Sequence, residues 1–288
     1  MTIRHKRGTN LAGRGALSTV VVSILAIHLG TLYAAQAPKE LHVIRRPSPH
    51  ASIALTDTSQ EDVGVLLGGP LAPLKKASFW LANNSDRPIV AIATKWSVAS
   101  SDGTIKIKRF TADSFLVTDA RPVVAAHSRL LVAPKLWVPE ERLADYVASP
   151  YFANVQRAGL QRTAEEFERS GDVMVEVDSV IFSDGEVVGP NRMGFDAEIT
   201  GRKAAARAVL AVLASAGQGG RDQRAALARI ASSPILKSDR SSVWQHRFAQ
   251  QFLHSPSIEN TARYLEQLPS VPTFHGNVMN APSLAGRQ

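Results

Sequence analysis

The sequence predicts an α+β protein, in which an antiparallel β-sandwich with inserted helices is followed by a C-terminal helical region. Three observations support this class. Apolar residues alternate with polar ones in several segments between residues 77 and 190, as they do in strands with one buried face. Short turns rich in Asp, Asn and Gly separate those segments, and no helix divides the first of them. After Phe195 the apolar period becomes helical.

The chain has 288 residues and a hydrophobic content of 44%, enough to fold around a substantial core. Its formal net charge is +8, and residues 196–288 carry 11 basic and 6 acidic side chains. Those charges are scattered along the segment rather than clustered. We therefore interpret them as a solvated surface and expect no nucleic-acid partner.

The first 37 residues have the layout of an export signal. Four basic residues precede or border the apolar run from Ala16 to Ile27, and no acidic residue occurs before position 38. Cleavage after Ala37 or Ala34 would release the mature protein into the periplasm or the medium. If neither site is cut, residues 16–35 are long enough to remain as an inner-membrane anchor, which leaves membrane association open. The absence of cysteine excludes a lipoprotein anchor and disulfides.

Residues 38–76 are rich in Pro, Ser and Gly, which predicts a flexible linker with at most a short edge strand at Ser52–Leu55. The sandwich domain is predicted for residues 77–195. It begins with three strands, near Ala77–Leu81, Ile89–Val98 and Ile105–Lys108. Tight turns join them, so we expect an antiparallel meander. The middle strand has small residues opposite its apolar face and should be central in its sheet.

Further strands are predicted at Ser114–Val117, Pro122–Ala126 and Leu130–Ala133. Two helices should follow. One begins at Pro139, which suits a first helical position, and the other runs from Tyr151 to about Glu168.

The last hairpin of the predicted sandwich covers residues 172–188. Alternating valines form its first half, and an Asp-Gly turn at residues 184 and 185 leads into a short return strand. The alternation breaks at Ser179, beyond which both faces are apolar. We therefore predict a β-bulge, or a strand that enters the core, near Ser179.

Residues 196–268 contain four apolar stripes at helical spacing, which predict four helices. Ser255 and Pro256 are expected to start the last of them. Residues 269–288 hold three prolines and little periodicity, so this tail is predicted to be disordered.

No catalytic, cofactor-binding or metal site emerges from the sequence. Asp178, Asp184 and Glu186 flank the last hairpin, but their pattern is that of turn residues and not of a calcium loop. His246 and His254 lie on one predicted helix without a third ligand. Trp80 and Trp96 are interpreted as core residues, with a ligand platform as the alternative; the eight histidines offer no zinc spacing.

Two short motifs carry a resemblance. They are the run Asn-Ser-Asp-Arg-Pro-Ile-Val-Ala at residues 84–91, followed by Trp96, and the run Val-Ile-Phe-Ser-Asp-Gly at residues 180–185, followed by Gly189-Pro190. Over residues 77–215 the chain resembles a group of uncharacterised exported bacterial proteins. The resemblance implies an immunoglobulin-like β-sandwich with a helical extension and no known activity. Asn191 departs from a form of the second motif that has an acidic residue there.

These observations lead to a functional expectation. The chain is interpreted as an exported envelope protein, a non-enzymatic binding or scaffolding module with a protein or other envelope partner. Two alternatives stay open. One is a hydrolase or carbohydrate-active protein with an unrecognised site in a cleft, and the other is a membrane-tethered regulatory or assembly subunit.

Overall fold

The computed structural model describes residues 41–58, 63–100, 102–116, 121–219, 222–236 and 238–276. The described residues all belong to one compact unit. The predicted export signal or anchor lies outside the described residues. Among the helices of the described ranges, none combines the length and the apolar character that a bilayer crossing requires.

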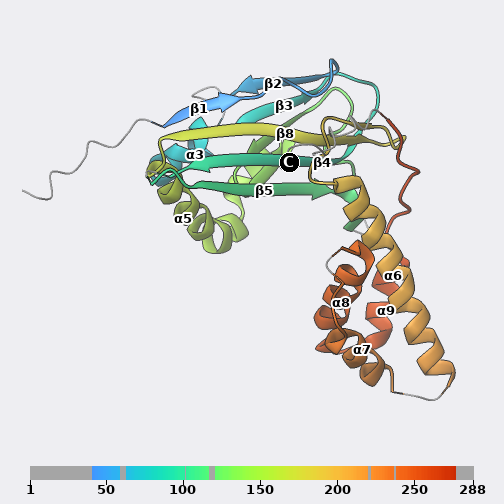
Figure 1. Ribbon diagram of the computed structural model, residues 1–288. Coiled ribbons are helices and arrows are strands. Elements are labelled where there is room, and N and C mark those ends of the chain that lie inside the picture. The colour runs from blue at the N-terminus through green and yellow to red at the C-terminus, as the bar shows by residue number, and fades with distance from the viewer. Residues whose placement is uncertain are drawn as a thin grey trace, which may run out of the picture. The chain divides into compact units, whose positions relative to one another are not determined.

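Two sheets form the strand part of the molecule (Figure 1). The first sheet contains, in spatial order, β1 (His42–Arg45), β8 (Asp172–Phe182), β4 (Ile89–Ala99) and β5 (Ile105–Asp113), with β9 (Val187–Val188) paired to the end of β8. The second contains β2 (Ile53–Asp57), β3 (Phe79–Asn83), β6 (Arg129–Ala133) and β7 (Leu136–Pro139). The pairing is antiparallel except between β1 and β8, where it is parallel. The predicted α+β class and the predominance of antiparallel pairing are confirmed.

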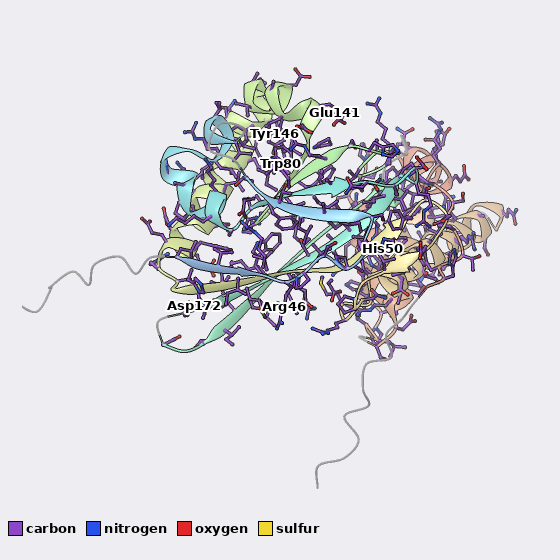
Figure 2. All side chains as sticks on the ribbon, turned by 90° about the horizontal axis from the view of Figure 1, so that it is seen from above. Arg46, His50, Trp80, Glu141, Tyr146 and Asp172 are labelled. Atoms are coloured by element: carbon purple, nitrogen blue, oxygen red, sulfur yellow. The ribbon has the colours of Figure 1, made fainter. Side chains whose placement is uncertain are left out.

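Both sheets contribute to one apolar core. Trp80 comes from β3 and Trp96 from β4, and both are almost fully buried; Trp80 is labelled in Figure 2. The indole nitrogen of Trp96 donates a hydrogen bond to the carbonyl oxygen of Ala77 at 3.0 Å, so its one polar atom is satisfied in the core. The interpretation of both tryptophans as core residues is therefore confirmed.

The prediction of a linker over residues 38–76 is wrong for the part that is described. Besides β1 and β2, this segment forms α2 (Gly64–Leu67), the 3₁₀ helix η1 (Gly69–Leu71) and α3 (Ala72–Lys76). Four leucines of these short helices are buried in the core, at positions 66, 67, 71 and 74. Pro70 and Pro73 occupy the first turns of two of the helices, where proline is tolerated, and so they start structure here.

The predicted meander is right for its second and third strands, since β4 and β5 pair antiparallel, and wrong for the first, because β3 belongs to the other sheet. Both edges of β3 are taken, one by β2 and the other by β6, so β4 must pair elsewhere. Ser114–Leu116, predicted as a strand, forms the 3₁₀ helix η2, and position 117 lies outside the described residues. Residues 122–126 make a single bridge, from Val124 to Ile89, instead of a strand.

The remaining helices of the described residues are η3 (Glu140–Arg142), α4 (Leu143–Ala148), the π-helical η4 (Phe152–Gln156), α5 (Arg157–Glu168), α6 (Phe195–Gln218), α7 (Gln223–Ser232), α8 (Arg240–Leu253) and α9 (Ile258–Glu266). The last four confirm the predicted helical region. The helix expected from Pro139 is present as η3 and α4, but Pro139 itself ends β7 and is the N-cap of η3, one position before the first helical residue. Ser257, not Ser255, caps α9, since its side chain accepts a hydrogen bond from the backbone N–H of Asn260.

The bulge predicted near Ser179 is present one residue earlier. Thr94 of β4 pairs with Val177 and Ala93 with Ser179, which leaves Asp178 as the extra residue in β8. The bulge reverses the side-chain alternation, so that Val177 and then Val180 face the core between the sheets. Ile181 turns to the outer face of the first sheet, where it joins residues of α6.

The tail predicted to be disordered from residue 269 is ordered up to Gly276. The backbone N–H of Val187 donates to the carbonyl oxygen of His275 at 2.7 Å, and the N–H of His275 donates to the carbonyl oxygen of Gly185 at 3.0 Å. Residues 277–288 lie outside the described residues. The C-terminal segment thus returns to the β8–β9 hairpin, next to the place where α6 begins.

Candidate binding site

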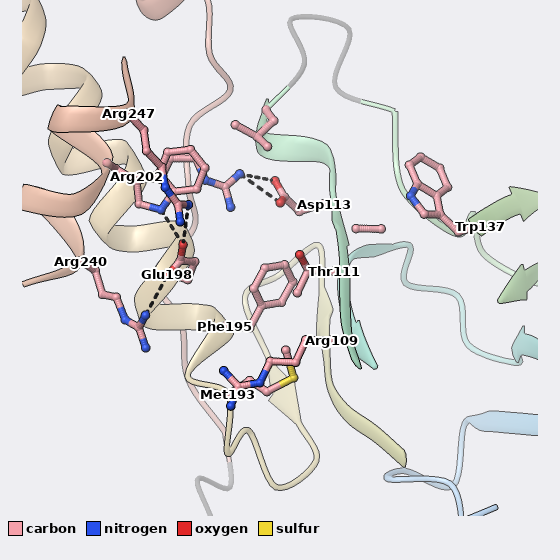
Figure 3. Close-up of a pocket in the computed structure, with 13 residues that line it drawn as sticks. Arg109, Thr111, Asp113, Trp137, Met193, Phe195, Glu198, Arg202, Arg240 and Arg247 are labelled. Atoms are coloured by element: carbon pink, nitrogen blue, oxygen red, sulfur yellow. Dashed lines mark hydrogen bonds and ion pairs between the residues drawn. The ribbon is translucent and has the colours of Figure 1, made fainter. Parts of the chain in front are cut away.

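A cavity of about 580 Å³ lies where β5 meets α6 and α8 (Figure 3). Its volume is within the range of small-molecule sites. Its walls combine arginines, two carboxylates and several apolar side chains: Arg109, Thr111, Ala112, Asp113, Leu116, Trp137, Met193, Phe195, Glu198, Arg202, Arg240, Trp244 and Arg247.

The bulge in β8 fixes the start of the helix that forms one wall. The buried carboxylate of Asp178 accepts hydrogen bonds from the backbone N–H groups of Arg192 and Met193, at 3.0 and 2.9 Å. Asn191 adopts φ 45°, and its side-chain oxygen accepts from the N–H of Phe195. These bonds satisfy N–H groups at and just before the first turn of α6, and so they set the direction in which the helix leaves the sheet.

The first two turns of α6 pack directly on the outer face of the first sheet. Phe195 and Ile199 contact a small apolar cluster that includes Ala91 and Ala93 of β4. The alanine methyls leave room for the helix to approach closely. The small residues that the sequence places opposite the apolar face of this strand therefore serve the attachment of the helical region.

A buried ion pair joins the helix to β5. The Arg202 guanidinium donates to both carboxylate oxygens of Asp113, at 2.9 and 3.0 Å, and each side chain is 5% exposed. The Nε–H of Arg202 is buried and has no hydrogen-bond partner in the described part of the chain. Because a buried charge needs a counter-charge, this pair holds the wall of the cavity in place.

Glu198 is the second carboxylate of the cavity, and three groups converge on it. It accepts a 2.6 Å hydrogen bond from the indole nitrogen of Trp244, and Arg240 and Arg247 approach it at 3.3 and 3.9 Å. The guanidinium carbons of Arg202 and Arg247 each lie 4.8 Å from the centre of a Trp244 ring. Cation–π contacts and the hydrogen bond thus fix the orientation of Trp244 in the cavity wall.

Arg109 is exposed on β5, and no side-chain hydrogen bond or ion pair joins it to the other described residues. Four arginines therefore line the cavity against two carboxylates, both of which are already bonded. Guanidinium groups match the geometry of carboxylate and phosphate oxygens. The surplus of positive charge favours the binding of an anion in the cavity. Trp137, Met193 and Phe195 supply apolar surface next to the arginines.

A second hollow, of about 710 Å³, lies on another face of α6, beside residues 271–274. It is lined by the cations Lys203, Arg207 and Arg240 and by the carboxylates Asp196 and Asp239. The Lys203 ammonium group donates to the carbonyl oxygen of Leu268 at 2.6 Å and is used to hold the C-terminal segment. Burial and then the neighbouring Arg207 lower the pKa of Lys203. This hollow has a smaller cationic surplus than the cavity at Arg109.

None of the three acidic residues considered in the sequence lines the cavity. Asp184 and Glu186 both approach the Arg87 guanidinium at 2.6 Å, while Asp178 binds backbone N–H groups. The hydrogen bonds that Arg87 donates to Asp184 and then to Glu186 raise the pKa of Arg87. His246 and His254 stand on α8 and just beyond its end, and neither lines the cavity.

Sequence reasoning missed the cavity because its residues come from three distant segments, 109–116, 193–202 and 240–247, with Trp137 from a fourth. One signal was available. Arg202 stands in the apolar stripe of α6, at helical spacing from Ile199 and Ala206, and all three are buried. A charged residue on the buried face of a helix requires a partner of opposite charge, so Arg202 indicates a buried ion pair. Nothing in the sequence named Asp113 as that partner.

Comparison with known proteins gave no significant match, either to a protein-family model, to a curated protein or to a solved structure.

Proposed function

We propose that this chain is an exported, non-enzymatic binding module that takes an anionic small molecule, or the anionic end of a larger one, into the cavity between β5, α6 and α8. The observation that carries the proposal is the surplus of guanidinium groups in that cavity, with Arg109 unengaged by the described residues. The ligand has a carboxylate or phosphate group for the arginines and an apolar body for Phe195 and Trp137.

The arrangement of the two carboxylates favours binding over hydrolysis. Asp113 is held by Arg202 with both oxygens, and Glu198 is held by Trp244 and two arginines. A general acid or base needs a carboxyl group that can reach the substrate and exchange a proton. Here the guanidinium and indole donors occupy the oxygens that such a role requires.

An immunoglobulin-like relationship is part of the proposal. In that fold, strand B pairs with E in one sheet and strand C with F in the other, and a tryptophan on strand C is buried. The pairs β3–β6 and β4–β8, with Trp96 buried on β4, fit this scheme. The chain departs from it at β7, which follows β6 in sequence, whereas strand D precedes strand E.

Export rests on the sequence of the first 37 residues, in which basic residues are followed by an apolar run. Amino-terminal sequencing of the protein from an envelope fraction tests it. A mature start at residue 35 or 38 means that the leader is cut and rules out the membrane-tethered alternative, whereas an intact start supports an anchor formed by residues 16–35.

Calorimetric titration of the protein tests the binding site. Benzoate and phenyl phosphate carry the proposed anionic group on an apolar ring, and benzamide is a neutral control of the same shape as benzoate. We expect saturable binding of at least one anion and none of benzamide. Arg109→Gln should weaken anion binding about tenfold, since a charge-assisted hydrogen bond is worth roughly 1.5–3 kcal/mol.

Arg142→Gln is the matched control, because Arg142 is exposed and does not line the cavity. It should bind the anion as the unaltered protein does. Equal binding of benzoate and benzamide, or equal loss in both arginine variants, contradicts the proposed site.

A further inference from the structure

β5 has one free edge. It is the last strand of the first sheet, and in the described part of the chain only β4 pairs with it. We propose that this edge is a docking site for an extended, acidic segment of a partner protein, which adds to the sheet as a further strand. The edge shares Arg109 with the cavity wall, but the proposal rests on the unpaired edge of β5 and not on binding of a ligand in the cavity.

The strand is long and regular enough to serve as a template. Its nine residues pair with β4 in nine consecutive positions without a register shift, from Ile105 opposite Ala99 to Asp113 opposite Ala91. The other edge strands differ: β1 has four residues, β2 has five, and β7 has four and ends at Pro139. Short edges, proline and lysines discourage strand addition, whereas a long edge offers more backbone hydrogen bonds. β5 is long and has no proline, and its lysines disfavour partner strands that do not offset their charge.

The first residues of β5 present apolar side chains on the exposed face of the strand. Ile105 is 65% exposed and Ile107 is 55% exposed, and both point to the same side because they are two residues apart. On the other side of the strand, Phe110 and Ala112 pack on the core. The core therefore anchors one half of β5, while the half that contains the isoleucines is open to a partner.

Charge distinguishes an acidic partner from a second copy of this chain. Lys106, Lys108 and Arg109 lie within four positions, and Glu166 of α5 is the carboxylate near the two lysines, at 3.9 and 2.5 Å. Antiparallel pairing of two β5 strands over their full length would place Arg109 opposite Arg109, and like charges directly opposite each other are destabilising. A strand with glutamate or aspartate at these positions gains cross-strand ion pairs instead, and so an acidic segment is the occupant that fits.

The test uses the full chain and a fluorescein-labelled peptide of seven alternating glutamate and valine residues, followed by fluorescence anisotropy. A peptide with lysine in place of glutamate controls for charge. A glutamate peptide with N-methylated alternate residues controls for backbone pairing, because it keeps the side chains and loses donors. We expect the glutamate peptide to bind about tenfold more tightly than either control.

Hydrogen exchange and one pair of variants locate the site. Bound peptide should slow exchange of the amides of residues 105–111. Ile105→Ser with Ile107→Ser should weaken binding about tenfold through lost apolar contact. Ile44→Ser, an exposed isoleucine on β1 at the opposite edge of the same sheet, should leave binding unchanged.

Equal binding of the glutamate and lysine peptides overturns the proposal, as does full binding of the N-methylated peptide. Protection of another strand, or a chain that dimerises in sedimentation with its own β5 amides protected, overturns it as well. Anion binding in the cavity is measured separately with benzoate. A peptide held only by the cavity arginines would keep its affinity in the Ile105→Ser, Ile107→Ser variant, so either proposal can fail while the other stands.

Discussion

Asp178 is the residue on which the junction between the sheet and the helical region depends. The bulge turns its carboxylate to the 192–193 backbone, and the side chain is fully buried. Its partners are backbone N–H groups, so each of the two carboxylate oxygens must accept a hydrogen bond. Ser179 marked the irregularity in the sequence, because alternation stops there. The sequence could not show that the preceding Asp would be the extra residue, since that depends on the register with β4.

Replacing Asp178 by Asn puts an NH₂ group against a backbone N–H. We expect Asp178→Asn to lower the free energy of unfolding by about 1–3 kcal/mol, the cost of leaving buried polar groups unsatisfied. Chemical denaturation measures this loss. Asp172→Asn, at the exposed start of the same strand, is the control and should change stability by less than about 1 kcal/mol. Equal effects at the two positions contradict the account.

The pair of Arg87 and Asp184 predicts a pH dependence. Burial acts to raise the pKa of Asp184, but hydrogen bonds from Arg87 and from the backbone of Glu186 outweigh it and the pKa is lowered. A carboxyl group whose pKa is lowered by folding stabilises the fold above the pKa of the unfolded chain. That stabilisation is lost as the pH falls through the folded pKa.

Asp184→Asn should therefore be less stable than the unaltered protein at pH 6, and the difference should shrink as the pH falls below about 4. Urea denaturation at several pH values measures it. In an Arg87→Gln background the same substitution should show little pH dependence, because the partner is gone. A difference that persists unchanged at pH 2.5 argues against the ion pair.

At the scale of elements, the turn between β8 and β9 connects the sheet to the C-terminal segment. Gly185 has φ 94°, and a Cβ there would lie 2.3 Å from the carbonyl oxygen of Thr273. The Asp-Gly pair predicted a turn from sequence, and the turn is present. The approach of residues 272–275 was not predictable, because three prolines and weak periodicity look like disorder when the hairpin that pairs with the segment is unknown.

Gly185→Ala should destabilise the protein and release the C-terminal segment, with faster hydrogen exchange at the amide of His275. Gly103→Ala is a matched control, since Gly103 has φ 80° with open space around its Cα. Both changes incur the cost of positive φ, about 1 kcal/mol, and only Gly185→Ala adds a collision. Equal losses of stability in the two variants would show that the close approach of residue 273 to Gly185 does not contribute to stability.

Local pattern predicted the elements far better than their pairing. The strand at Ile89–Ala99, the hairpin of β8 and β9 and the four C-terminal helices follow from alternation, turn residues and apolar stripes. The predicted pairing of β3 with β4 failed because a tight turn between two strands does not determine whether they belong to the same sheet. The prediction of a linker failed because a composition rich in Pro, Ser and Gly is typical of irregular chain. Pro70 and Pro73 instead lie in the first turns of short helices whose leucines are buried.

At the scale of the whole molecule, the helical region is fixed to the strands at several points. Arg202 of α6 pairs with Asp113 of β5, Tyr264 of α9 donates to the carbonyl oxygen of Leu116 at 2.9 Å, and residues 269–276 return to the hairpin. These contacts create the cavity, whose residues are far apart in sequence. In the sequence, the cavity is indicated only by Arg202, a charged residue in the apolar stripe of α6.

The buried ion pair gives a prediction with a clear sign. Asp113→Leu should destabilise the protein by about 3–5 kcal/mol, because it leaves the Arg202 charge buried without a partner. Removal of both charges, in Asp113→Leu with Arg202→Met, should recover most of that loss. Thermal and chemical unfolding of the single and double variants measure it. A double variant as unstable as the sum of its two single changes contradicts the coupling.

The central claim is that the cavity between β5, α6 and α8 receives the ligand, and the four tryptophans of the chain test it directly. Trp137 and Trp244 line the cavity, whereas Trp80 and Trp96 are buried in the core between the sheets. In a titration with benzoate followed by NMR, the indole N–H signals of Trp137 and Trp244 should move and those of Trp80 and Trp96 should stay. Four unmoved signals, or shifts confined to the core pair, contradict the claim.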